Sequence, residues 1–296
     1  MKKKTINWII GFLFVVLFLS EAIYSFKHTN FSKQQSGQTI QIVHNPYETE
    51  IASANVLSLV LEEAGFNVRL VSVDNAIMYE SIATGQSDAM TAAWLPTTHG
   101  TTYAEYEDRL DNLGPNLEGA EAGLAVPDYM DVDSIADLTD EADQTIMSIE
   151  PGAGVTVQTE QAMNLYDNLH GWKLESPSTG AMLASVESAV KNQEEIIVSA
   201  WTPHWMFDEY GLKMLDDPQL AYGEAENIYT LARKGLKEDH PKAYQIIDNF
   251  YWDIEDMDSV THAMATGADD RSAAKQWIEN NRQKVDSWLE GVYDEE

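Results

Sequence analysis

Hydrophobic and polar positions along the chain alternate between two kinds of segment. Short apolar runs of strand length occur at residues 40–43, 68–73 and 89–94, and amphipathic segments of helical length lie between them at 51–64 and 76–84. This alternation is typical of βαβ units rather than of a sandwich made of strands alone. The pattern therefore predicts an α/β fold framed by a parallel sheet.

The same order of elements returns in the second half of the chain. Its predicted strands lie at 145–149, 172–175 and 196–201, with helical segments after Gly154 and at 180–192. Both halves end alike, the first on Trp94-Leu95-Pro96 and the second on Trp201-Thr202-Pro203. Each tryptophan stands at the carboxyl end of a strand, where ligands bind in open α/β sheets. Two lobes that face each other would each direct one tryptophan into the cleft between them.

The order of segments also predicts where the chain passes between the lobes. Strand-like residues at 123–127 and 228–232 bracket the second set of elements and are the expected crossovers. Amphipathic helices expected at 240–250, 273–280 and 285–289 would complete the first lobe. We therefore expect lobe 1 to comprise residues 40–125 and 230–296, and lobe 2 to comprise residues 126–229.

The N-terminus has the features of an export segment. Lys2, Lys3 and Lys4 precede an apolar run that begins at Trp8 and continues, less purely, to Phe26. The run lacks a small-residue cleavage site, which favours a retained membrane anchor at residues 1–26 over a cleaved signal peptide. The lysines would stay in the cytoplasm, and a polar linker at 27–39 would tether the lobes to the outer face of the cell membrane.

Composition narrows the choice of partner. The chain has 49 acidic and 18 basic residues and a formal charge of -31, which argues against nucleic acid as a partner. Such a charge indicates either a saline habitat, where salt screens the self-repulsion, or simply a solubilising surface. The chain has no cysteine, no G-x-S-x-G or H-E-x-x-H motif and no P-loop. We therefore expect a binding protein and not an enzyme, with no cofactor and no metal site.

Tryptophans at strand ends indicate the chemistry of the expected ligand. An indole face attracts a cation, and a quaternary ammonium group cannot donate a hydrogen bond, so an aromatic cage is the natural way to hold it. Trp94 and Trp201 would form two walls of this cage, and Trp205 or Trp252 could supply a third. The alternative is that these rings only pack in the core or at the hinge.

The opposite end of a zwitterionic ligand is a carboxylate, which free N–H groups at a helix N-terminus can bind. The turns at 45–51 and 152–155 both precede predicted helices and offer such groups. Glu48 and Glu50 would have to point away from an anion in the first turn, and the glycines of the second turn are equally consistent with a tight turn alone. His99 and His204 could bind a carboxylate or could be structural.

Several strings along the chain are characteristic of one family. They are WLPTTH at 94–99, LGPNL at 113–117, GAML at 180–183, WTPHWMF at 201–207 and ARKGL at 232–236. Over residues 40–289 the chain resembles the glycine betaine binding proteins of osmoprotectant ABC importers. The resemblance implies a type II periplasmic-binding-protein fold that closes on its ligand by a hinge.

The resemblance also implies roles for individual residues. Trp94 and Trp201 match the cage directly, and Trp252 matches the third wall by its position in the C-terminal region. Main-chain amides near Glu50 and Ile51 are expected to hold the ligand carboxylate. Four further residues are expected around the site: Tyr47, His99, His204 and Trp205.

The expected function is that of an extracytoplasmic solute-binding protein that delivers a quaternary ammonium zwitterion to an ABC permease and its ATPase. The sequence does not separate glycine betaine from carnitine, choline or proline betaine, because all four carry the same cationic group. A ligand-sensing ectodomain that signals through a partner is the alternative. Relatives often carry a cysteine for a lipid anchor, and its absence here leaves tethering to the apolar segment.

Overall fold

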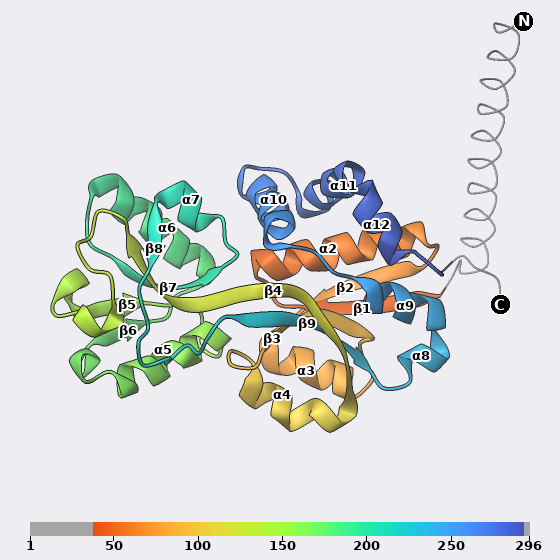
Figure 1. Cartoon of the computed structure of the whole chain (residues 1–296), viewed down its shortest axis with the longest axis horizontal. Helices are drawn as coiled ribbons and strands as arrows, with labels where there is room; N and C mark the ends of the chain where they lie inside the picture. Colours follow the sequence, from red (N-terminus) through yellow and green to blue (C-terminus); the bar gives the residue numbers. More distant parts are fainter. Residues whose placement is uncertain (1–37, 293–296) are drawn as a thin grey trace, which may run out of the picture.

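The computed structural model describes residues 38–292 and shows two lobes joined by two long strands (Figure 1). The predicted membrane anchor at 1–26 and the linker up to residue 37 lie outside the described residues. Within residues 38–292, no helix is both long enough and apolar enough to cross a membrane.

Lobe 1 is built on three parallel strands. Its elements are β1 (Thr39–His44), β2 (Asn67–Ser72), β3 (Ala89–Leu95), α2 (Glu48–Glu63), α3 (Asn75–Ala83) and α4 (Gly100–Tyr106). Strand β1 pairs with β2 on one side and with β3 on the other. Every residue of β3 is buried, as expected for a mostly apolar strand in the interior of a sheet. The predicted strands and helices of this lobe match the observed ones to within a few residues.

The lobes are connected by β4 (Leu110–Pro127) and β9 (Glu226–Arg233), which contain the two predicted crossovers. The first half of β4 pairs antiparallel with β9, and its second half pairs antiparallel with β7 (Ile197–Thr202) of lobe 2. One strand thus belongs to both lobes, and the sheet is mixed rather than purely parallel as predicted. The pairing of β4 with β9 shifts register near Pro115, because proline has no N–H to donate to the ladder.

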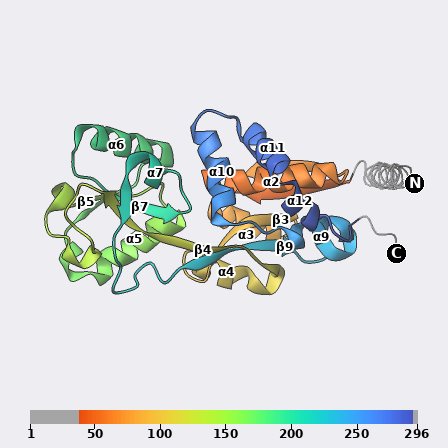
Figure 2. The ribbon, with the colours of Figure 1, turned by 45° about the horizontal axis from the view of Figure 1, so that its top comes forward.

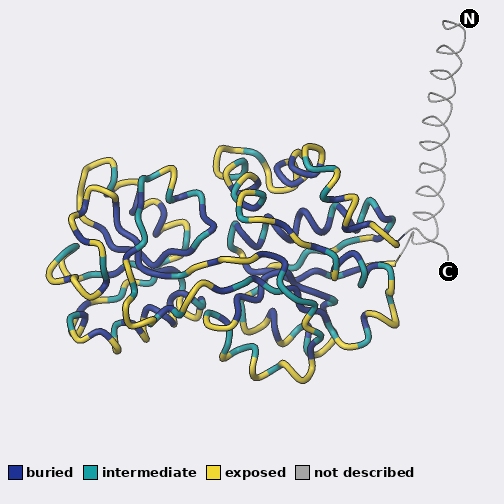
Figure 3. The backbone as a smooth tube through the Cα atoms, viewed as in Figure 1, coloured by how far each residue is buried: buried dark blue, intermediate teal, exposed yellow. Residues whose placement is uncertain are grey.

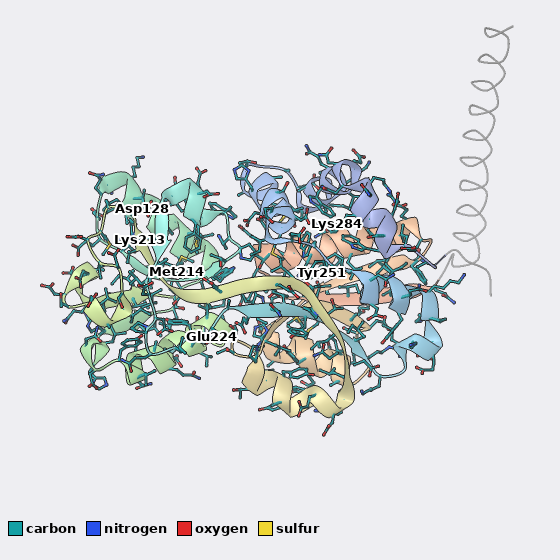
Figure 4. All side chains as sticks on the ribbon, viewed as in Figure 1. Asp128, Lys213, Met214, Glu224, Tyr251 and Lys284 are labelled. Carbon is teal, nitrogen blue, oxygen red and sulfur yellow. The ribbon has the colours of Figure 1, made fainter. Side chains whose placement is uncertain are left out.

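Lobe 2 repeats the arrangement around β7. Its other elements are β5 (Thr145–Met147), β6 (Lys173–Glu175), β8 (Leu212–Met214), α5 (Gly154–Leu165), α6 (Thr179–Asn192) and α7 (Met206–Tyr210). Strand β5 pairs in parallel with both β6 and β7, while β8 pairs antiparallel with β4. Met214 lies against the crossing strand, since a Cβ on Gly123 of β4 would lie 2.7 Å from the Met214 sulfur (Figure 4).

The C-terminal residues return to lobe 1, as predicted. Their helices are α8 (Leu236–Asp239), α9 (Pro241–Asn249), α10 (Ile254–Ala265), α11 (Asp270–Asn280) and α12 (Arg282–Trp288). Helices α10 and α11 lie over α2 (Figure 2) and cover the side of α2 that faces away from the sheet. Helix α2 is therefore buried on most sides (Figure 3), and its alanines and serines let its neighbours approach closely. The sequence did not predict α10.

Lobe 1 has an aromatic core beneath these helices. The ring of Trp252 lies 5.5 Å from that of Phe250 and 5.8 Å from that of Trp277, which stacks on Trp288 at the same distance. Trp252 has no exposed surface. The side chain of Lys284 pairs with Asp253, which begins α10, at 2.7 Å (Figure 4). The C-terminal segment is therefore an integral part of this lobe.

Candidate ligand-binding site

One pocket lies where the two lobes meet, at the carboxyl ends of their parallel strands. It contains about 390 Å³ of empty space, including the part that opens to solvent. Its walls come from both lobes: Tyr47, Thr49, Glu50, Trp94, Thr98, His99, Ala122, Ile149, Ala153, Gly154, Val155 and Trp201. None of these lining residues is a lysine or an arginine, so an anionic group in this pocket must be held by uncharged donors.

Three of the walls are aromatic. Trp94 comes from the end of β3 and Trp201 from β7, and each stands two residues before a proline that follows a cis peptide bond. Tyr47, at the N-cap of α2, supplies the third ring, and its centroid lies 6.3 Å from that of Trp201. The structure thus brings the two predicted tryptophans together and adds a tyrosine between them and the first turn of α2.

Trp252 is the exception among the expected cage residues. It does not line the pocket, and it lies in the aromatic core of lobe 1 with Phe250 and Trp277. The position is set by packing, because the C-terminal helices bury this indole completely against the sheet. The third aromatic residue that lines the pocket is therefore Tyr47 and not Trp252.

Replacing Trp252 with leucine should lower stability without changing ligand affinity. The substitution leaves a cavity in the core, and large-to-small changes of this kind cost about 2 to 5 kcal/mol of unfolding free energy. Urea unfolding and calorimetric titration of the Trp252→Leu variant measure the two effects separately. A large loss of affinity at full folding would place the residue in the site after all.

The two turns expected to offer amides to a carboxylate differ in their hydrogen bonds. The N–H groups of Glu50 and Ile51 already donate to the carbonyl of Tyr47, at 3.1 and 2.8 Å, and Ile51 does not line the pocket. In contrast, the first turn of α5 enters the pocket at Gly154 and Val155, and no side chain caps this helix. The first N–H groups of a helix have no partner within it. Free donors are therefore available in lobe 2, in the second of the two turns considered from the sequence. Thr49, in the first turn of α2, also lines the pocket, and no side chain caps that helix either.

Glu50 points into the pocket rather than away from it. Its carboxyl group accepts a hydrogen bond from the Asn45 N–H at 3.2 Å and interacts with the side chain of Trp94. Burial raises the pKa of Glu50 to about 8, although both of these hydrogen bonds act in the opposite direction. Glu50 is therefore mostly protonated at neutral pH, and a protonated acid can lie near a ligand without repelling its carboxylate.

The pKa of Glu50 predicts a loss of stability as pH rises. Folding raises the pKa of Glu50 from its ordinary value of 4.5 to about 8. Between these two pH values the folded state therefore binds more protons than the unfolded state. Stability should fall across this window by at most about 1.4 kcal/mol per pH unit. Urea unfolding at pH 5 and pH 8 should show this fall, and the Glu50→Gln variant should show a smaller one. Equal falls in both proteins would assign the effect to other carboxyl groups.

The two histidines differ in their relation to the pocket. His99 lines it and accepts a hydrogen bond from the Trp94 N–H through Nδ1 at 3.2 Å. His204 does not line it but lies behind the cage, with its ring edge-on to Trp201 at 4.9 Å. Burial lowers the pKa to about 4 for His99 and to about 3 for His204, so both are neutral at physiological pH. Trp205 also lies outside the pocket, and its indole N–H donates to Glu48.

The lobes are in contact around the pocket. The Thr98 hydroxyl, from lobe 1, lies 3.1 Å from Gln158 Oε1 of α5 and also bonds to Glu226, at the start of β9. A Cβ on Gly154 would overlap the Thr98 methyl group and would lie 3.2 Å from the Thr98 carbonyl oxygen. Only glycine allows this approach, so the described conformation is a closed one.

Comparison with known proteins agrees with this geometry. Residues 38–280 match the family described as the substrate binding domain of the ABC-type glycine betaine transport system. The chain belongs to this family. The family comprises substrate-binding domains of transporters and not enzymes. The prediction that the chain belongs to a family of extracytoplasmic binding proteins is confirmed.

Individual relatives support the same assignment. The chain is 47% identical over 164 residues to the glycine betaine/carnitine transport binding protein GbuC of Listeria monocytogenes, and this alignment covers 54% of each chain. In this alignment the chain spans about half the length of the Listeria relative. It is similar to lactococcal OpuAC in its closed conformation with glycine betaine, with 44% identity and a TM-score of 0.84 over 86% of this chain and 100% of that one.

A second solved structure is the glycine betaine/L-proline-binding protein ProX of Borrelia burgdorferi. The identity is 33% and the TM-score 0.82, over 87% of this chain and 100% of that one. These likenesses confirm the predicted two-lobed periplasmic-binding-protein fold.

Proposed function

We propose that this chain captures glycine betaine between its lobes and delivers it to the permease of an ABC importer. One observation carries the proposal: three aromatic rings from both lobes and the N-terminus of a helix meet in a single pocket between the lobes. The rings suit a quaternary ammonium group, and the helix N-terminus suits a carboxylate. A betaine carries both groups within a few bonds of each other.

The ammonium end would lie among Tyr47, Trp94 and Trp201. A trimethylammonium group offers only methyl surface around its charge, so ring faces can surround it where hydrogen-bond acceptors could not direct a bond. Each desolvated ring face contributes about 0.5 to 2 kcal/mol. The lining residues include no basic side chain that would repel the cation.

The carboxylate end would lie at the first turn of α5. Gly154 and Val155 line the pocket in the first turn of this helix, and the positive end of the helix dipole adds to the attraction of their N–H groups for an anion. His99 lines the same region as a neutral ring, since burial lowers its pKa to about 4. The ligand would therefore bridge lobes, with its cation shared by both and its anion on lobe 2.

Related solutes are the alternative ligands. Carnitine, choline and proline betaine share the quaternary ammonium group, and the Listeria relative is named for both glycine betaine and carnitine. Choline has no carboxylate for α5, so it should bind more weakly than glycine betaine. Carnitine and proline betaine are bulkier and should bind more weakly if the closed pocket fits the smaller ligand.

Calorimetric titration of the purified full chain against the four solutes tests this proposal. We expect glycine betaine to bind most tightly and choline to lose the contribution of the carboxylate. Binding of choline alone would assign the pocket to a cation without an anionic end. Binding of none of the four would refute the proposed function.

The tether and the partners complete the proposal. We propose that the apolar run from Trp8 to Phe26 holds the chain at the outer face of the membrane, next to the permease and ATPase. The run has no small-residue cleavage site, which supports an uncleaved segment, and the chain has no cysteine that could carry a lipid. Mass spectrometry of the membrane fraction should find Met1 or Lys2 at the N-terminus, and a start between Ser25 and Gln38 would contradict this. A neighbouring kinase gene in place of permease and ATPase genes would favour the sensing alternative.

A further inference from the structure

The Glu48–Trp205 hydrogen bond joins the two lobes outside the ligand pocket. The indole N–H of Trp205, in lobe 2, donates to the carboxylate of Glu48, in the first turn of α2 in lobe 1. The two residues are 157 positions apart in the chain, and neither lines the pocket. A hinge motion that separates the lobes breaks this bond, so it belongs to the closed conformation.

Glu48 is half-buried at the edge of the cleft. Burial raises the pKa of its carboxyl group, the hydrogen bond from Trp205 lowers it, and the charge of Asp270 raises it further. Closure thus removes water from a carboxylate that lies in the field of another acid. The indole N–H replaces part of that lost hydration, and without it the closed state would hold a poorly solvated charge.

Trp205 connects this bond to the ligand cage. Its ring lies 5.4 Å from that of His204, whose ring is in turn edge-on to Trp201 at 4.9 Å. His204 is fixed in this position because its Nδ1 accepts a hydrogen bond from the Met206 N–H at 3.1 Å. On the opposite lobe, Glu48 directly follows the cage residue Tyr47. Both ends of the Glu48–Trp205 bond therefore adjoin walls of the pocket.

We propose that Glu48 and Trp205 form a latch that stabilises the closed conformation and slows ligand release, although neither touches the ligand. The inference rests on the proposed function, because it concerns closure around the same pocket. The bond is absent in an open protein, so the latch should affect the rate of release and not the rate of capture. Loss of a hydrogen bond to a charged group should accelerate release by about tenfold.

Stopped-flow fluorescence of glycine betaine release tests the latch in the full chain. The variants are Trp205→Phe, which keeps the ring and removes the N–H, Glu48→Ala, and the combination of both. We expect each single variant to release ligand about ten times faster, with a capture rate within about twofold of the parent. The double variant should release no faster than either single variant, because only one bond is lost.

Trp172→Phe is the matched control. Trp172 is another buried tryptophan of lobe 2, and its indole N–H has no hydrogen-bond partner, so the same substitution removes no bond. Its release rate should equal that of the parent. Parent-like release from folded Trp205→Phe, or single effects that multiply in the double variant, would overturn the latch.

A second readout separates the latch from the identity of the ligand. The chain has no cysteine, so two dyes can be placed specifically through Glu160→Cys on α5 and Glu279→Cys on α11, both at exposed positions on opposite lobes. Energy transfer between the dyes should show a smaller closed fraction in Trp205→Phe and Glu48→Ala, with and without glycine betaine. If the parent did not bind glycine betaine, the proposed function would fail, and the closed fraction without ligand would still decide the latch. An unchanged closed fraction would overturn it.

Discussion

Replacing Trp94 or Trp201 with leucine should weaken glycine betaine binding much more than replacing it with phenylalanine. Leucine is also apolar, but it has no ring face to attract the ammonium group. The loss of one desolvated ring should reduce affinity by about twofold to thirtyfold, and phenylalanine should retain part of this contribution. Calorimetric titration of the four single variants gives these differences directly.

Trp172→Leu provides the control for this series, since Trp172 is buried in lobe 2 but does not line the pocket. It should lower stability and leave affinity unchanged. If both leucine variants at Trp94 and Trp201 bound glycine betaine as tightly as the parent while remaining folded, the rings would belong to the core or the hinge, and the class of ligand would be open again.

The second large effect is expected from Gly154→Ala, which should prevent full closure. The added Cβ would overlap the Thr98 methyl group across the cleft and approach the Thr98 carbonyl oxygen to 3.2 Å. The side chain can move, but the carbonyl belongs to the backbone of the opposite lobe. Overpacking of this kind costs about 1 to 3 kcal/mol, so affinity should fall by about fivefold to a hundredfold.

Gly180→Ala is the matched control, because a Cβ on Gly180 meets no atom within 4 Å and this glycine also lies in the first turn of a lobe 2 helix. Titration with glycine betaine and small-angle scattering should show that the Gly154 variant binds weakly and remains extended, while the Gly180 variant behaves as the parent. Parent-like affinity of Gly154→Ala would mean that closure at this point is not needed for binding.

Much of the fold was predictable because the hydrophobic pattern of each segment agrees with the place of that segment in the sheet. The segments that became β1, β3 and β7 are mostly apolar and mostly buried, as is expected of strands inside a sheet. The two tryptophans were predictable for the same reason, since each stands near the end of such a strand and both occur in the pattern Ala-Trp-x-Pro. Helix α10 was harder to predict, because the acidic residues of its first turn are also typical of a loop. In the structure, Asp253 and Asp256 form a capping box that begins the helix.

The third aromatic ring was expected at Trp252 because the sequence does not reveal which aromatic residues are buried in the core. Trp252 follows Phe250 and Tyr251, and such a cluster of aromatic residues is also expected of a binding site. The packing of α11 and α12 instead buries Trp252 with Trp277 and Trp288. One signal did indicate Tyr47. It precedes the first helix of lobe 1 just as Ala153 precedes α5 in lobe 2, and both N-cap residues line the pocket.

The choice between the two helix N-termini also depended on three-dimensional structure. Both turns offer amides in the sequence, but in lobe 1 the Tyr47 carbonyl accepts the N–H groups of Glu50 and Ile51. The burial of Glu50 in the pocket was unexpected, because a carboxyl group beside an anion site is acceptable only when it is protonated. The raised pKa that permits this arises from desolvation, which depends on neighbours distant in the sequence.

In the proposed site, the positive charge of the ligand, held by ring faces, decides binding. Calorimetric titration of the full chain with glycine betaine and with 3,3-dimethylbutanoate, in which carbon replaces the ammonium nitrogen, tests it most directly. The two molecules have the same shape and the same carboxylate and differ only in the cation. We predict that the carbon analogue binds at least about thirtyfold more weakly, since every ring contact loses its electrostatic part. Equal affinity for the two molecules would contradict the account, because the pocket would then recognise shape and carboxylate alone.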